Sequence, residues 1–133
     1  MLLVVFTLFV TCIAQCPGNK YVNPPEAQRR YQGTLNNEPA RSMLDSSFAW
    51  CTLAGLVNPW MTMDLTNDMM VVGMIVQGRQ DHAPHHVKTY EVQYSDDGVT
   101  YVSSGTYTAN NIQSQNAKSE VSLVSQNHHK DVE

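Results

Sequence analysis

The chain has 133 residues, of which 42% are hydrophobic and 15% are charged, as expected for one domain with a core of ordinary size. Its formal net charge of −4 argues against a basic nucleic-acid-binding surface, so no nucleic acid is expected as a partner. The three cysteines form no Cys-x-x-Cys pair and no zinc-ligand spacing, which leaves redox and structural zinc sites without support.

The first residues have the pattern of a secretory signal peptide. An uncharged apolar run covers residues 2–10, and small residues precede a cleavage position after Ala14. The run is shorter than the roughly 20 residues of a membrane-spanning helix. The competing interpretations are a buried N-terminal strand and a membrane anchor. We expect residues 1–14 to be a signal peptide, and the product to be secreted and extracellular with no transmembrane span.

The next segments predict short strands separated by turns. Residues 16–39 contain many Pro, Gly and Asn residues, which favours a long loop. Period-two alternation over residues 61–65 predicts a half-buried strand, and the continuous apolar run at 69–76 predicts a strand buried on both faces. Because no amphipathic helix appears between these segments, we expect an antiparallel β-sandwich or barrel.

A β-hairpin is the most regular prediction in the chain. Residues 89–94 alternate between apolar and polar side chains, as in a half-buried strand. The following Ser95-Asp96-Asp97-Gly98 has the residue types of a turn, with Gly98 where positive φ is required. Val99 and Tyr101 are expected to begin the return strand.

The chain becomes polar after Asn111, where Ser, Gln, Asn, Lys and His dominate. Val121, Leu123 and Val124 form an apolar cluster, and they predict one weak strand over residues 120–125. Residues 125–133 are expected to be a disordered tail.

Five motifs then occur in a specific order and spacing. They are Ala40-Arg41, Ala49-Trp50-Cys51, Trp60-Met-Thr-Met-Asp64-Leu65, Val72-Gly73-Met-Ile-Val-Gln77-Gly78-Arg79 and Val87-Lys-Thr-Tyr90-Glu-Val-Gln-Tyr94-Ser95-Asp96-Asp97-Gly98-Val-Thr-Tyr101. Together they resemble the discoidin family, also called the coagulation factor V/VIII type C domain, over about residues 28–111.

The resemblance implies an all-β fold, an antiparallel jelly-roll β-sandwich of the discoidin-like and galactose-binding-domain-like kind. The domain would cover residues 15–111, with residue 124 as the alternative end. The implied function is cell adhesion or surface recognition. Loops at one end of the sandwich would bind a glycan, an anionic phospholipid or an extracellular-matrix protein, including at a peripheral membrane surface.

The sequence also departs from the family's pattern. Thr66 follows Asp64-Leu65, where the family usually has Gly. The family has two further strands and a terminal Cys beyond the point where this chain stops, so the final strands are expected to be missing. Cys16 and Cys51 would then be paired with each other, paired with another chain, or free. The alternative function is a truncated, non-binding paralogue that needs a partner chain to complete its sheet.

Arg79 is the first candidate ligand contact. Its guanidinium group can bind a carboxylate, sulfate or phosphate through two parallel hydrogen bonds. The competing interpretation is an internal salt bridge to Asp45 or Asp81. The resemblance implies a further role for this segment. In the family, a strand that ends in Gln-Gly-Arg, here Gln77-Gly78-Arg79, is followed by a projecting loop and a second strand, and this arrangement presents a ligand-binding loop from a rigid scaffold.

The loop after this arginine adds His82, His85 and His86 to the candidate ligand-binding residues. With Asp81 they form a hypothetical metal cluster, which would make the protein a metal-dependent lectin. Pro84 and the irregular spacing favour a solvated loop, so no metal site is expected. Histidines near a ligand would give its binding a mild pH dependence, because imidazole changes charge near neutrality.

Arg29, Arg30 and Tyr31 belong to the first long loop, where basic and aromatic side chains would suit a lipid surface or a glycan. Trp50, in a second loop over residues 50–59, is a candidate platform, although the family pattern favours packing. No Ser lies in a nucleophile-elbow context and no carboxylate pair has a recognisable setting, so we expect neither catalysis nor a cofactor.

Overall fold

The computed structural model describes residues 20–35, 41–52, 54–67, 69, 71–81, 85–109 and 117–123, together with the backbone of residues 6–10. In this part of the chain the regular structure consists of β-strands and one 3-10 helix, η1 (Glu26–Gln28). The β-rich class predicted from the sequence is therefore confirmed. No helix of the described residues has the length and apolar character needed to cross a membrane. The predicted tail at 125–133 lies outside the described residues.

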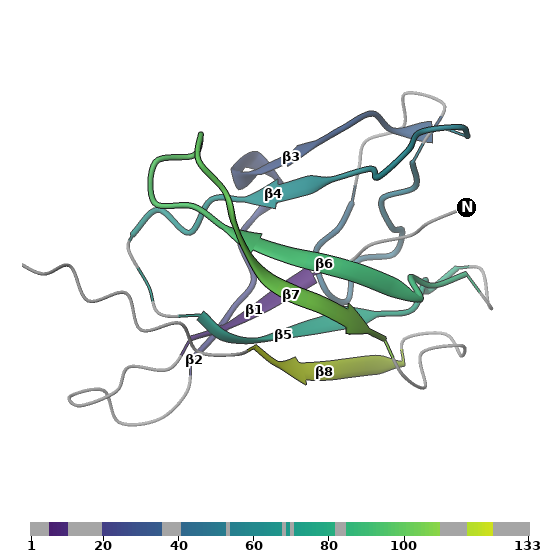
Figure 1. Ribbon diagram of the computed structural model, residues 1–133. Helices are drawn as coiled ribbons and strands as arrows, with labels where there is room; N and C mark the ends of the chain where they lie inside the picture. Colours follow the sequence, from purple (N-terminus) through teal and green to yellow (C-terminus); the bar gives the residue numbers. More distant parts are fainter. Residues whose placement is uncertain are drawn as a thin grey trace, which may run out of the picture.

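The strands of the described residues form three antiparallel sheets (Figure 1). The larger sheet has the order β2 (Lys20–Val22), β1 (Phe6–Val10), β5 (Val71–Gln77) and β8 (Lys118–Ser122). The two-stranded sheets pair β3 (Arg29–Tyr31) with β4 (Met61–Met63), and β6 (Thr89–Tyr94) with β7 (Val102–Thr108). In Figure 1 the β6–β7 pair crosses in front of the larger sheet.

β5 lies in the interior of the larger sheet, between β1 and β8. Residues 73–77 of this strand are buried, as the continuous apolar run predicts. β6 shows the expected alternation, with Tyr90 buried and Val92 half-buried while Thr89 and Glu91 are exposed. Both strand predictions are confirmed, and β4 also falls inside its predicted segment.

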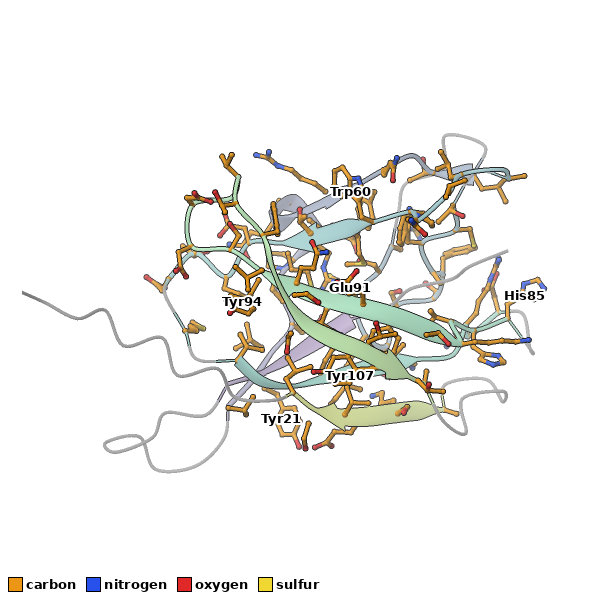
Figure 2. The ribbon with its side chains drawn as sticks, in the orientation of Figure 1. Tyr21, Trp60, His85, Glu91, Tyr94 and Tyr107 are labelled. Atoms are coloured by element: carbon orange, nitrogen blue, oxygen red, sulfur yellow. The ribbon has the colours of Figure 1, made fainter. Side chains whose placement is uncertain are left out.

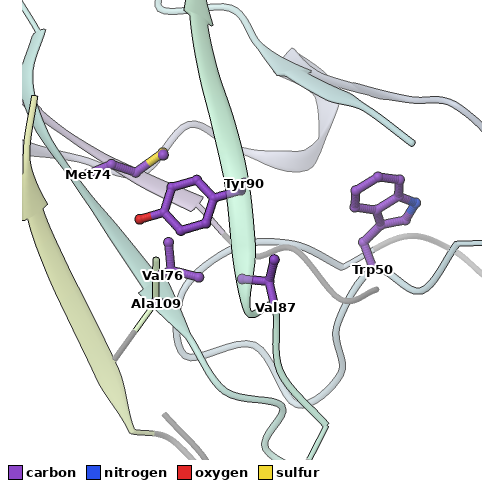
Figure 3. Close-up of a cluster of buried hydrophobic side chains, with 6 residues drawn as sticks. All are labelled: Trp50, Met74, Val76, Val87, Tyr90 and Ala109. Carbon is purple, nitrogen blue, oxygen red and sulfur yellow. The ribbon is translucent and has the colours of Figure 1, made fainter. Parts of the chain in front are cut away.

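The core lies where β5 faces β6 (Figure 3). Its buried members are Trp50, Met74, Val76, Val87, Tyr90 and Ala109. Half-buried side chains from β3 and β4, namely Tyr31, Met61 and Met63, pack against them. Strands of different sheets therefore bury their inward faces against each other, as in a sandwich.

The predicted long loop at 16–39 is wrong for part of its length. Residues 20–35 include β2, η1 and β3, although each has only three residues. Side-chain hydrogen bonds hold β3 in place: Arg29 is 6% exposed, and its Nη1 donates to the carbonyl oxygen of Ser42 at 3.0 Å. Polar anchoring of this kind produces no apolar periodicity, which explains why the sequence pattern did not reveal it.

The return strand of the hairpin begins at Val102, not at Val99 or Tyr101. Asp97 extends the turn because its Oδ1 accepts hydrogen bonds from the backbone nitrogens of Val99 and Thr100, at 2.8 and 2.7 Å. These bonds turn the chain outward before β7, and Val99 is 82% exposed. Gly98 has the positive φ expected from the sequence, +71°.

Part of the expected signal peptide forms a strand in the structure. The backbone of Phe6–Val10 is β1, which pairs with β2 on one side and with β5 on the other. The backbone of these five residues is therefore part of the larger sheet. Cleavage after Ala14 stays a prediction, because strand pairing does not report on processing.

Candidate functional site at the loop end

The connections between β3 and β4 and between β5 and β6 meet at one end of the sheets (Figure 1). Backbone hydrogen bonds join Leu35 N to Cys51 O at 2.8 Å, and Arg79 N to His85 O at 3.0 Å. We call the described residues of 32–35, 51–60 and 78–88 the loop end. The turn at 95–101 lies at the opposite end, since β6 leads away from the loop end to reach it.

Arg79 is fixed by Asp81 in a bidentate ion pair. Its Nε donates to Asp81 Oδ1 at 2.5 Å and its Nη2 donates to Oδ2 at 2.7 Å. This bond raises the pKa of Arg79 above its ordinary value, with partial burial opposing the shift. Of the two internal partners considered from the sequence, the structure selects Asp81. The side chain keeps 18% of its surface exposed, so part of Arg79 is accessible to solvent.

Cys51 joins the two loops of this end. The Arg79 Nη1 atom donates to Cys51 Sγ at 3.3 Å, while the Cys51 carbonyl oxygen accepts from Leu35. Cys16, which the sequence considers as a partner of Cys51, lies outside the described residues, so the pairing of the two cysteines stays a prediction. The ion pair and the thiol contact together give the loops a fixed shape.

The histidine loop extends from the same end. His85, labelled in Figure 2, and His86 are half-buried. His82, the third histidine of the candidate set, lies outside the described residues. Among the residues that are described, no group of three or more His, Cys, Asp and Glu side chains is placed to hold a metal ion.

Asp45 ties a neighbouring loop to the ends of β5 and β8. Its backbone nitrogen donates to Gln77 Oε1 at 2.8 Å, and its carboxylate accepts from Lys118 Nζ at 2.8 Å. The hydrogen bond from Lys118 is the largest cause that lowers the pKa of Asp45. The sequence did not assign Gln77 this role, and the available signal was a polar side chain that ends an otherwise apolar strand.

Arg29 was a candidate ligand contact, but the structure places it in the interior. Besides Ser42, it donates through Nε to the carbonyl oxygen of Pro24 at 2.9 Å and through Nη2 to Asn23 Oδ1 at 2.8 Å. Burial is the main cause that lowers its pKa. The guanidinium is occupied with holding three chain segments together. Its neighbour Arg30 is exposed.

Tyr31 is half-buried and Trp50 is fully buried. The Tyr31 hydroxyl donates to Glu26 Oε2 at 2.5 Å, and burial raises the pKa of this phenol. Its ring centroid lies 5.3 Å from that of Trp50, which is 0% exposed and donates through Nε1 to Gly33 O at 2.8 Å. Trp50 is therefore not available as a ligand platform, and the packing interpretation describes it correctly.

Two exposed apolar side chains belong to the connection between β3 and β4. The sequence did not single out Val57, whereas Trp60 was weighed as a ligand platform and expected mainly to pack. Val57 is 81% exposed and Trp60 is 50% exposed. Trp60 is anchored because its carbonyl oxygen accepts from Gln32 N at 2.9 Å, and Asn58 between the two has a left-handed φ of 50°. The sequence signal was an isolated valine before an Asn-Pro turn, which alone does not separate an exposed tip from a buried contact.

The described geometry is thus a β scaffold with anchored loops at one end. Comparison with known families decides its class: the F5/8 type C domain matches residues 26–128. The chain belongs to the F5/8 type C domain family. The resemblance found in the five sequence motifs is confirmed, and the matched region extends beyond residue 111.

Two relatives are both lactadherins, from Sus scrofa and Bos taurus. Each is 37% identical over 54 residues, which are 40% of this chain and 13% of the relative. The comparison therefore covers a small part of those proteins. No solved structure matches the chain.

Proposed function

We propose that this F5/8 type C domain is a secreted, non-catalytic binding module for adhesion or surface recognition. Its loop end would recognise a glycan, an anionic phospholipid headgroup or an extracellular-matrix protein. The strands would follow the jelly-roll order of the family. The observation that carries the proposal is the combination, at this end, of exposed Val57 and Trp60 with the fixed guanidinium of Arg79.

The exposed apolar side chains support a surface that is covered when a ligand binds. Contiguous exposed apolar patches rimmed by polar residues are typical of interaction sites, and we propose that Val57 and Trp60 contribute to such a patch. Trp60 adds an aromatic ring with a polar nitrogen, which suits boundaries between apolar and aqueous surroundings. Because both residues belong to a loop with anchored backbone, little ordering is required on binding, and the cost in conformational entropy is small.

Arg79 would contact an anionic ligand by exchanging its partner. Its guanidinium already holds Asp81 through Nε and Nη2, so a carboxylate, sulfate or phosphate must compete with Asp81 or use the part that is accessible to solvent. Removing the Asp81 charge should then strengthen binding of an anion, whereas removing Arg79 should weaken it. The opposite signs separate a ligand contact from a purely internal ion pair.

A binding panel on the purified protein tests the proposal. It contains vesicles with and without phosphatidylserine, a glycan array and immobilised collagen, each with the wild type, Arg79→Ala and Asp81→Asn. We expect one ligand class to bind, with weaker binding by Arg79→Ala and stronger binding by Asp81→Asn. Equal binding by wild type and Arg79→Ala would exclude Arg79 from the site. Binding to none of the ligands would contradict the function.

A further inference from the structure

β1 is an internal strand of the larger sheet, with a paired strand on each side. It pairs antiparallel with β5 from Phe6↔Val76 to Val10↔Val71, with one irregularity between Phe9 and Val10. On its other side it pairs with β2, from Leu8↔Val22 to Val10↔Lys20. The five residues of β1 therefore provide the backbone contacts between β2 and β5.

Without β1, the interior strand of the sheet would become an edge. β5 would keep β8 as a partner, but its opposite backbone groups would lose their hydrogen bonds. These groups belong to a strand whose residues 73–77 are buried, including the core side chains of Met74 and Val76. An exposed edge on an apolar strand readily pairs with another extended chain. β2 would lose the strand that joins it to this sheet.

The same five residues lie before the cleavage position expected after Ala14. One molecule cannot both lose this segment and use it to fill the sheet. We propose that the position between β2 and β5 is an acceptor site for an extended apolar strand. Phe6–Val10 fills it while the N-terminal segment is retained, and a strand of the same chemistry from a partner protein fills it once that segment is removed.

The pairing defines the chemistry of the incoming strand. It must run antiparallel to β5 and supply about five extended residues without proline, because each backbone N–H along the ladder is a donor. The sequence Phe-Thr-Leu-Phe-Val shows that apolar and β-branched residues suit the position. Recognition would rest on main-chain hydrogen bonds, as in other cases where a peptide adds a strand to a sheet.

This acceptor site is separate from the proposed ligand surface. The acceptor site is a strand ladder within the larger sheet, whereas the ligand surface consists of loops at the ends of β3 to β6. Binding at one site can therefore fail while binding at the other succeeds.

The first experiment cuts the folded full chain. A protease recognition sequence is inserted between Ala14 and Lys20, the protein is folded and cut, and a fluorescent peptide covering residues 5–11 is added in excess. Fluorescence anisotropy and mass spectrometry measure exchange of the peptide for the released segment. The control peptide carries Leu8→Pro, which removes one donor and disrupts the strand.

We expect the cut protein to take up the native peptide with saturation, and the proline peptide to bind about tenfold more weakly or less. The uncut protein should take up neither peptide. Equal binding of both peptides would indicate unspecific apolar adsorption and overturn the proposal. Failure of the cut protein to bind the native peptide would also overturn it.

The second experiment leaves the chain uncut and compares Leu8→Pro with Leu8→Val, which keeps the backbone donor. Hydrogen exchange of residues 71–77 should be about tenfold faster or more in the proline variant, because β5 loses protection on one edge. Faster exchange supports the proposal, whether it is confined to this sheet or extends through the chain. Equal exchange in the two variants would overturn it.

Discussion

Thr66 has a φ of 68°, in the left-handed region that β-branched residues rarely occupy. Two contacts hold it there: its backbone nitrogen donates to Asp64 Oδ1 at 2.7 Å, and its hydroxyl accepts from Gln28 Nε2 at 2.8 Å. The family usually has glycine at this position, and the backbone geometry gives the physical reason. The sequence revealed the departure, and only the structure revealed the conformation that makes it unfavourable.

Replacing Thr66 with glycine should therefore increase stability. We expect Thr66→Gly to raise the free energy of unfolding by about 1 kcal/mol, because relief of left-handed strain exceeds the loss of an exposed hydrogen bond. Asn67→Gly is the matched control. It adds the same backbone freedom at an exposed residue whose φ is not positive, so it should lower stability. Urea denaturation measures both variants, and a larger loss in Thr66→Gly than in Asn67→Gly would contradict this account.

At the scale of elements, strands were predictable where side-chain periodicity determines them. The apolar run at 69–76 was recognised because burial of a strand on both faces requires consecutive apolar residues. The alternation at 89–94 was recognised because burial on one face requires an apolar residue at every second position. β2 and β3 were missed because each has only three residues. β3 is also held by the hydrogen bonds of Arg29 and not by an apolar pattern. The start of β7 was predicted too early in the chain because Asp97 lengthens the turn. The sequence does not show whether the carboxylate of a turn residue will accept hydrogen bonds from backbone nitrogens.

Asp97 offers a test of that turn. Its Oδ1 accepts hydrogen bonds from Val99 N and Thr100 N, and these backbone donors hold its pKa well below the ordinary value. We expect Asp97→Ala to accelerate hydrogen exchange of the Val99 and Thr100 amides while the core stays protected. Asp96→Ala, at the adjacent exposed position, is the control and should leave both amides unchanged. Unchanged exchange in Asp97→Ala would show that the backbone alone forms the turn.

Across the whole molecule, the core makes stability depend on alkaline pH. Burial is the main cause that raises the pKa of Tyr90 to about 12 from its ordinary 10.0, with a smaller contribution from Tyr107. Folding therefore favours the neutral phenol. Its contribution is complete below pH 10 and is lost as the pH rises through 12.

We expect the free energy of unfolding to fall over that interval, with phenolate absorbance rising as the fold is lost. Tyr90→Phe cannot ionise, so its stability should fall less steeply over the same interval. Denaturation at a series of pH values measures this difference. Identical slopes for the wild type and Tyr90→Phe would contradict a buried neutral phenol at this position.

The site was only partly predictable. Arg79 lies at the end of a strand, as the sequence predicts, and Asp81 is one of the two internal partners considered for it. Its role in ligand binding stays a prediction. Trp50 and Arg29 were assigned to a ligand surface but are buried, because sequence does not show which aromatic or basic residue a loop folds inward. Val57 was missed because sequence also does not show which apolar residue a loop leaves exposed. Its exposure depends on how the loop is anchored.

The central claim is that the loop end, and not the opposite end, binds the ligand. Val57 and Val99 give a matched pair, because they are 81% and 82% exposed. Val57 belongs to the loop over residues 51–60, and Val99 belongs to the turn over residues 95–101. The decisive measurement is the dissociation constant of Val57→Asp and Val99→Asp for the ligand found in the binding panel, with urea denaturation to confirm equal stability. We predict that Val57→Asp weakens binding about tenfold or more while Val99→Asp binds as the wild type does. Weakening by Val99→Asp with no effect of Val57→Asp would contradict the account.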